Sequence, residues 1–388
     1  MVVNVHRGYM PVRVMNLPAN DQTVRITVLT WSRALGDTLL LVPALRAIRG
    51  ANPEGLIRLI CGPEPGQLLS RAGLADEVGD NSDPRLALLA AGVEGTPAAD
   101  YAGRESARVG QPHEVRRKHG RAATLPGAGH CGADWVGAGE STGAAGVLNK
   151  DAVKAALGGP ELVVGFVSRT CELMSGLELV GIVGLAVDPI PPPGVHAAEH
   201  FERSLEAVGI PSLWEGAEAV APVVVESPNV PSHGVLIHPG SGATWKCAPP
   251  EIYREVAAGL ARIGRPVAVL EGPADAGRIH AMEWKGEIVR AESMVELAHT
   301  LQNFNAFVGN DSGVSHLSGL LGVPTVALFG PTHPDTWRPL GPNVRIIRTC
   351  SREPESRIRV CEDPHCMAGI EASAVIAATV ETIKPVQE

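Results

Sequence analysis

The sequence lacks the long apolar run that a membrane-spanning helix requires. Nowhere in its 388 residues does an apolar stretch approach the roughly 18 to 20 residues of such a helix. The opening MVVNVHRGYMPVRVMNLPANDQT also lacks a continuous apolar core and a small-residue cleavage site, so it does not read as a secretory signal. The sequence therefore predicts a protein without a transmembrane segment, and leaves a peripheral membrane contact open.

Paired cysteines are missing as well. The seven cysteines are odd in number and scattered, and no two of them form a C-x-x-C pair. This usage suits a reducing compartment and predicts a cytoplasmic protein. Cys350, Cys361 and Cys366 could form a zinc site with His365, or could belong to a loop with free thiols. We favour the thiols and predict no metal site.

An excess of positive charge is also lacking. The 33 Lys and Arg residues face 42 Asp and Glu residues, and the net charge of −9 argues against nucleic-acid binding as the main activity. With 45% hydrophobic and 19% charged residues, the composition is that of a globular protein. Its length exceeds that of one typical hydrophobic core, so two domains are expected.

What the sequence does contain is a regular alternation of strand and helix patterns. In the first half these are a strand at 24–30, a helix at 38–51, a strand at 56–62, a helix at 67–79, a strand at 161–168 and a helix at 196–210. Residues 95–160 interrupt the rhythm with glycine, alanine and a basic cluster between Arg104 and Arg121. This irregular insertion is either a solvated excursion or a surface for an anionic acceptor.

The second half repeats the plan. Its predicted elements are a strand within 234–242, a helix at 250–264, a strand at 265–272, a helix near 275–284, a strand at 287–290, a helix at 293–304, a strand at 306–310 and a final helix at 372–384. Such alternation indicates parallel strands with right-handed crossovers. We expect an α/β protein of two Rossmann-like, doubly wound domains that face each other. The chain divides into an extension (1–23), a first domain (24–210), a linker (211–232) and a second domain (233–388).

The segment GNDSGVSHLSGLLGVPTVALFG (309–330) predicts an anion-binding turn between a strand and a helix. Asp311 or Ser312 can cap the helix, and Gly313 lets a ligand approach the backbone. Ser315 and His316 add side-chain donors on the first turn. Because a helix N-terminus has unpaired N–H groups and a positive dipole end, a phosphate or diphosphate fits this turn. An ordinary capped helix is the alternative.

Two more loops follow strand ends and would line the same region. In RALGDTLLLVPALRAIR (33–49), Asp37 follows Gly36 and is either a helix cap or a catalytic carboxylate. In HPGSGATWKCAPPEIY (238–253), Ser241, Gly242 and Thr244 are small donors and Lys246 is a cation. A carboxylate facing a bound diphosphate suggests base-assisted displacement.

These three stretches, in this order, resemble the glycosyltransferase family that contains the ADP-heptose:lipopolysaccharide heptosyltransferases, glycosyltransferase family 9. The matching marks are LGDTLLLVPALRAIR, the HPGSG…K loop, VGNDSGVSHLSGLLGVPTVALFGPTHPDTWRPLGP, and a late C…CM…I…V spacing that ends at Val375. The resemblance covers residues 24–95 and 161–383. It implies the GT-B fold, two Rossmann-like domains with an interdomain cleft. The second domain would bind the donor and the first the acceptor.

The resemblance also implies a role for each site residue. Asp37 matches the catalytic base of an inverting, metal-independent transfer, and Asp275 falls where a carboxylate contacts the nucleotide ribose. The donor and phosphate contacts would be Ser241, Thr244, Lys246, Asp311, Ser312, Gly313 and His316. No cofactor is implied beyond the ADP-linked sugar donor.

The implied function is transfer of heptose from ADP-heptose to an acceptor hydroxyl, in lipopolysaccharide biosynthesis as the family's commonest role. The sequence does not distinguish a glycan acceptor from a small-molecule acceptor. Two alternatives remain: a nucleotide-sugar epimerase of the same architecture, and a noncatalytic nucleotide-sugar-binding paralogue.

Overall fold

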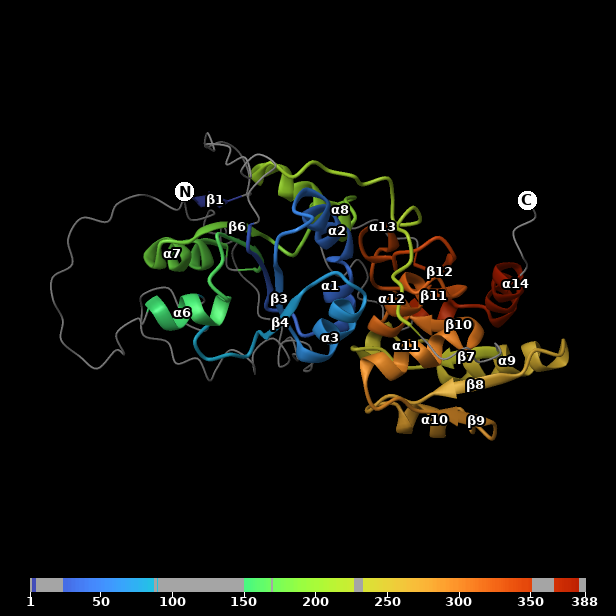
Figure 1. Ribbon diagram of the computed structural model, residues 1–388. Coiled ribbons are helices and arrows are strands. Elements are labelled where there is room, and N and C mark those ends of the chain that lie inside the picture. Colours follow the sequence, from blue (N-terminus) through green and yellow to red (C-terminus); the bar gives the residue numbers. More distant parts are fainter. Residues whose placement is uncertain are drawn as a thin grey trace, which may run out of the picture.

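A computed structural model describes residues 2–4, 24–86, 89, 150–168, 170–226, 233–350 and 366–383. Predictions that fall elsewhere, such as the basic cluster from Arg104 to Arg121 and the possible zinc ligands Cys361 and His365, lie outside these residues. The described chain forms two parallel sheets, each with helices on its faces (Figure 1).

The first sheet has the strand order β1-β6-β5-β2-β3-β4, and every pair in it is parallel. Its strands are β1 (Val2–Asn4), β2 (Ile26–Thr30), β3 (Ile57–Cys61), β4 (Glu77–Asp80), β5 (Leu162–Phe166) and β6 (Val183–Val187). Its helices are α1 (Leu35–Leu39), α2 (Val42–Ala51), α3 (Pro63–Arg71), α6 (Lys150–Leu157), α7 (Thr170–Val180) and α8 (Ala197–Arg203), followed by the 3₁₀ turn η2 (Ser204–Val208).

The second sheet has the order β12-β11-β10-β7-β8-β9 and is also parallel throughout. Its strands are β7 (His233–His238), β8 (Val267–Leu270), β9 (Glu287–Val289), β10 (Phe304–Asn310), β11 (Thr325–Phe329) and β12 (Val344–Arg348). The helical elements are η3 (Thr244–Lys246), α9 (Pro250–Arg262), α10 (Ala276–Ala281), α11 (Met294–Gln302), α12 (Gly313–Leu320), α13 (Pro334–Trp337), η4 (Cys366–Gly369) and α14 (Ala372–Ile383).

The central strands are buried along their whole length because helices cover both faces of each sheet. All five residues of β2, of β5 and of β11 are buried. Continuous burial of this kind is typical of parallel sheets and explains why these strands appear in the sequence as apolar runs rather than alternating patterns. Each sheet brings the carboxyl ends of its strands to one edge, where the loops that follow them gather.

The single helix predicted at 38–51 is two helices. Helix α1 ends at Leu39, and α2 begins at Val42 with Pro43 in its first turn. Proline has no N–H and its ring clashes with the preceding turn, so a continuous helix through Pro43 is unfavourable. As a result Asp37 lies within a separate five-residue helix at the end of β2.

The helix predicted at 67–79 is wrong in its second half. Helix α3 starts earlier, at Pro63, and ends at Arg71, and Gly73 follows with a left-handed φ of 72°. The N–H of Leu74 donates to the carbonyl of Leu69, which closes the helix end in the manner typical of glycine C-caps. Residues 77–80 then form β4 at the edge of the sheet.

Three other segments differ from expectation. Val2–Asn4, expected to be an irregular extension, pairs with β6 as the edge strand β1. Residues 150–157, inside the expected irregular insertion, form helix α6 with Val153 in the core. The edge strand β12 was not predicted, because its Arg345 and Arg348 break the apolar pattern. No helix within the described residues is both long enough and apolar enough to cross a membrane.

The two sheets are connected by a packed interface. Side chains of α1 and α2, such as Leu39 and Leu45, share one buried cluster with Leu317 and Leu320 of α12. On the α3 side, the N–H of Met294 donates to Glu64 Oε2 at 3.0 Å. On the α8 side, His196 Nε2 lies 3.1 Å from the carbonyl oxygen of Arg338. Helices α1 and α12 therefore meet between the two sheets (Figure 1).

Candidate functional site

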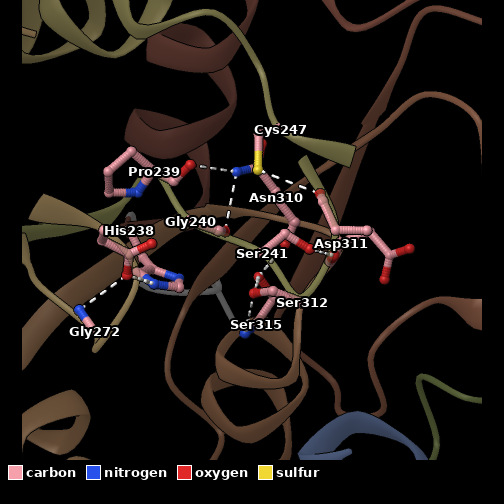
Figure 2. Close-up of polar contacts among 12 residues, drawn as sticks. His238, Pro239, Gly240, Ser241, Cys247, Gly272, Asn310, Asp311, Ser312 and Ser315 are labelled. Atoms are coloured by element: carbon pink, nitrogen blue, oxygen red, sulfur yellow. Dashed lines mark hydrogen bonds and ion pairs between the residues drawn. The ribbon is translucent and has the colours of Figure 1, made fainter. Parts of the chain in front are cut away.

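The site forms where the loops after β7 and β10 meet, and Asn310 joins them. Its side-chain amide is fully buried and donates to the carbonyls of Pro239 (2.9 Å) and Gly240 (3.1 Å), as Figure 2 shows. Its Oδ1 accepts from the N–H of Ala248 at 2.9 Å and the hydroxyl of Tyr253 at 2.6 Å. The amide nitrogen thus holds the HPGSG loop, while the amide oxygen ties the strand end to Ala248 and to Tyr253 of α9. The feature of the sequence that points to Asn310 is a polar residue at the end of an apolar strand.

Asp311, the next residue, is 4% exposed, and its carboxylate accepts two side-chain hydrogen bonds. Its Oδ2 accepts from Lys246 Nζ at 2.8 Å and from Thr332 Oγ1 at 2.7 Å. Burial pushes the pKa of Asp311 upward, but the charge of Lys246 and these hydrogen bonds outweigh it, so the pKa lies below its ordinary value. Asp311 is therefore a charged carboxylate paired with the predicted phosphate-binding lysine. Sequence reasoning did not identify Thr332.

The start of α12 has the expected cap. Ser312, not Asp311, occupies the N-cap position, and its hydroxyl accepts from the N–H of Ser315. Ser315 Oγ in turn donates to the carbonyl of Asn310, and Ser241 Oγ donates to the carbonyl of Asp311 at 2.7 Å. These bonds hold the turn in one conformation (Figure 2). Thr244 lies on η3 and is exposed.

His316 lies one turn inside α12 and is 5% exposed. Burial lowers its pKa, as does Lys246, while Asp311 and Asp37 favour the charged form. Its Nε2 is 3.9 Å from Asp311 Oδ1, and its Nδ1 is buried with no hydrogen-bond partner among the described residues. A neutral imidazole fits these surroundings.

Helix α1 brings Asp37 next to this turn. A Cβ placed on Gly313 would lie 2.7 Å from Leu35 Cβ and 3.1 Å from the nitrogen of Gly36, and one placed on Gly36 would lie 3.3 Å from His316 Cδ2. The two backbones can approach this closely only because both positions are glycine. Asp37, the residue after Gly36, is consequently close enough to His316 for its carboxylate to oppose the lowering of the pKa of His316.

Asp37 is exposed and is not the cap of α1. The N-cap of that helix is Ala34, which makes no side-chain capping bond. The carboxylate instead accepts a hydrogen bond from Ser32 Oγ at 2.6 Å. Of the two interpretations that the sequence left open, the helix cap is therefore excluded by the geometry. The catalytic role stays a prediction.

The side chain of Asp275 is buried inside the second domain. Its Oδ2 accepts from His238 Nε2 and from the N–H of Gly272, both at 2.9 Å. A Cβ on Gly240 would lie 2.0 Å from its Oδ1, so the carboxylate presses against the HPGSG loop. Burial raises the pKa of Asp275, but the bond from His238 and other contacts outweigh this and leave it lowered. Asp275 thus braces the HPGSG loop, and its ribose contact stays a prediction.

The possible zinc site is incomplete in the part of the chain that is described. Cys350 and Cys366 pack against each other at the end of the second domain. Their two expected co-ligands lie outside the described residues. Within the described ranges, no group of three or more His, Cys, Asp and Glu side chains is arranged to hold a metal ion.

The architecture of two facing parallel α/β domains is that of GT-B glycosyltransferases. A glycosyltransferase of family 9 from Veillonella parvula matches with a TM-score of 0.62 at 18% identity, covering 94% of this chain and 99% of that one. The Escherichia coli heptosyltransferase WaaC, solved with ADP, matches with a TM-score of 0.58 at 16% identity, covering 92% and 99%. At these identities the likeness shows the fold alone, and it confirms the predicted fold class.

Sequence comparison then identifies the family. Residues 195–365 match the model of glycosyltransferase family 9 (heptosyltransferase). Lipopolysaccharide heptosyltransferase 1 of Pseudomonas aeruginosa is 35% identical over 106 residues, which are 26% of this chain and 29% of that relative. Lipopolysaccharide heptosyltransferase 2 of E. coli is 49% identical over 43 residues, 11% of this chain and 12% of that relative. The matched stretches thus span less than a third of either curated relative. The match to glycosyltransferase family 9 covers residues 195–365, and it confirms the predicted resemblance.

Proposed function

We propose that this protein transfers heptose from ADP-heptose to an acceptor hydroxyl, with inversion at the anomeric carbon. The observation that carries the proposal is the contact between α1 and α12. It places the Asp37 carboxylate of one domain beside the N-terminus of α12 and His316 of the other. A carboxylate next to an anion-binding turn suits a displacement in which one group takes a proton while the other receives negative charge.

The reaction then runs as one displacement. The acceptor oxygen forms a bond to the anomeric carbon as the bond from that carbon to the phosphate oxygen breaks. The hydroxyl proton passes to Asp37, and the electron pair of the broken bond leaves with the diphosphate. Because one carboxylate serves as base and no covalent sugar–enzyme step is needed, the configuration at the anomeric carbon inverts.

The leaving diphosphate would be stabilised by the N-terminus of α12 and by Lys246. The positive end of the helix dipole favours negative charge at the start of α12. Lys246 is tied to Asp311 on one side, but its side chain is 25% exposed and has two further N–H donors for phosphate oxygens. With this cation in place we infer that no divalent metal is required.

The donor sugar is inferred from the relatives. Two curated relatives are named lipopolysaccharide heptosyltransferases, and the E. coli heptosyltransferase WaaC has been solved with ADP-2-deoxy-2-fluoro heptose. For this chain, ADP-heptose as donor and a lipopolysaccharide-core or small-molecule acceptor are proposals on that basis.

A product screen tests the proposal. The protein is incubated with a panel of ADP- and GDP-linked sugars, with and without lipopolysaccharide-core and small-molecule acceptors, and products are identified by mass spectrometry. Transfer or slow ADP release from ADP-heptose, unaffected by EDTA, is expected. ADP binding without any turnover would indicate a noncatalytic binding protein, and an isomerised nucleotide sugar would indicate an epimerase. Activity lost in EDTA and restored by magnesium or manganese would contradict the metal-independent mechanism.

A further inference from the structure

The Ser32 hydroxyl lies in the loop between β2 and α1, and its two hydrogen bonds set its direction. Its Oγ accepts from the N–H of Ala34 at 3.2 Å and lies 2.6 Å from Asp37 Oδ2. Because Ala34 can only donate in this pair and an ionised carboxylate can only accept, the hydroxyl proton must point to Asp37. A single oxygen of the carboxylate is thereby held.

The loop that carries Ser32 is itself anchored. Asn81, 8% exposed at the end of β4, donates to the carbonyls of Thr30 (3.0 Å) and Ser32 (3.2 Å). The N–H of Ser32 donates to Thr30 Oγ1 at 3.2 Å. The position of the Ser32 hydroxyl is thus set by residues at the ends of β2 and β4, which lie on either side of β3 in the first sheet, whereas Asp37 lies on a helix of only five residues.

We propose that Ser32 is a positioning residue for the base. By holding Oδ2 of Asp37, it restricts the rotation of an exposed side chain and leaves Oδ1 to take the acceptor proton. An exposed aspartate otherwise samples several rotamers, and only those that aim an oxygen at the acceptor hydroxyl are productive. This role rests on the proposed function, since it requires Asp37 to be the base.

The test compares four variants by ADP release from ADP-heptose in water, and with any acceptor from the product screen. Ser32→Ala should lower kcat about tenfold or more. The KM for ADP-heptose and the affinity for ADP should stay unchanged, because the donor site lies on the other domain. Ser32→Thr keeps the hydroxyl and should restore kcat. The double variant Ser32→Ala/Asp37→Asn should be no slower than Asp37→Asn alone.

Ser82→Ala is the matched control. Ser82 makes a similar pair with Asp80 at the end of β4, donating through its N–H at 2.8 Å and its hydroxyl at 2.7 Å. It has no contact with Asp37 among the described residues, and its loss should leave turnover unchanged.

Three results would overturn the proposal: wild-type kcat in Ser32→Ala, an equal loss in Ser82→Ala, or a further loss of rate when Ser32→Ala is added to Asp37→Asn. Failure of the positioning role is distinguishable from failure of the proposed function. In the first case Asp37→Asn is inactive while Ser32→Ala turns over normally. In the second, Asp37→Asn itself keeps its activity.

Discussion

At the scale of single residues, a substitution of Asp37 distinguishes an enzyme from a noncatalytic binding protein. Since Asp37 does not cap α1, Asp37→Asn changes its charge without removing a helix cap. We expect transfer to fall about 10²- to 10⁴-fold, the usual contribution of a general base. Affinity for ADP, measured by calorimetry, should remain at the wild-type value. Near-wild-type turnover would remove Asp37 as the base.

Lys246 pairs with Asp311 and is proposed to bind the donor phosphates, and Lys246→Ala tests both contributions. In Lys246→Ala the buried Asp311 carboxylate loses its paired cation and keeps Thr332 as a donor. We expect ADP affinity to fall at least about tenfold because charge-assisted bonds to phosphate are lost. Unfolding free energy should also fall, on the order of 2 kcal/mol, because a buried carboxylate is left unpaired.

The control for this variant is Lys285→Ala, which removes an exposed lysine in the loop between α10 and β9. It should change neither ADP affinity nor stability. If Lys246→Ala bound ADP as tightly as wild type but melted earlier, Lys246 would be an internal counter-ion of Asp311 and not a donor ligand.

At the scale of elements, the crossing of α1 and α12 requires glycine at its centre. In Gly313→Ala the added Cβ would lie 2.7 Å from Leu35 Cβ, so the two helices must separate. We expect a loss of about 1 to 3 kcal/mol in the free energy of unfolding, as for overpacked sites. Transfer should fall as well, because Asp37 moves with α1. Thermal unfolding and the ADP-release assay measure the two effects.

Gly50→Ala is the matched control, because Gly50 lies in α2 and a Cβ there meets nothing within 4 Å. Because Gly50 lies in the last turn of α2, alanine there should stabilise by at most about 0.5 kcal/mol. Equal stability and activity in Gly313→Ala and wild type would mean that the close approach of the helices does not matter for function.

At the scale of the whole molecule, a buried histidine couples the contact between the two halves to pH. His196 Nδ1 accepts from the N–H of Ala198, and its Nε2 faces the carbonyl of Arg338 on the other side of the interface. The ring is also stacked on Trp214. Burial lowers the pKa of His196 from 6.5 to about 4, although the bond to Arg338 opposes this. The neutral ring is therefore part of the folded structure.

The consequence is loss of stability in mild acid. Below pH about 6.5 the unfolded chain binds a proton at His196 that the folded chain does not bind until about pH 4. The free energy of unfolding should therefore decrease by up to about 3 kcal/mol between these values. His196→Asn still caps α8 but cannot titrate, so its melting temperature should depend less steeply on pH. An unchanged slope would contradict this assignment.

His280→Asn, at an exposed position on α10, serves as the comparison and should leave the slope as in wild type. His316 also has a pKa lowered by burial, so part of the acid sensitivity should persist in His196→Asn.

The sequence by itself determined the alternation of strands and helices and the capped turn before α12. Both follow from local patterns: fully buried strands appear as apolar runs, and a Ser cap with a glycine behind it marks a helix start. The same patterns failed where polar residues occupy edge strands, as in β4 and β12, since an edge strand is only partly buried. They also failed at Pro43, which lay inside an otherwise helical pattern.

Only the tertiary structure decided how the site residues meet. Three contacts join residues that are far apart in the sequence: the close approach of Gly36 to His316, the pairing of Lys246 with Asp311, and the bond between Asp275 and His238. No periodicity in the chain encodes these distances, because they depend on how two sheets pack and where their strand ends are aligned. The residue types predicted the chemistry of each loop, and the packing of α1 on α12 brought that chemistry to one place.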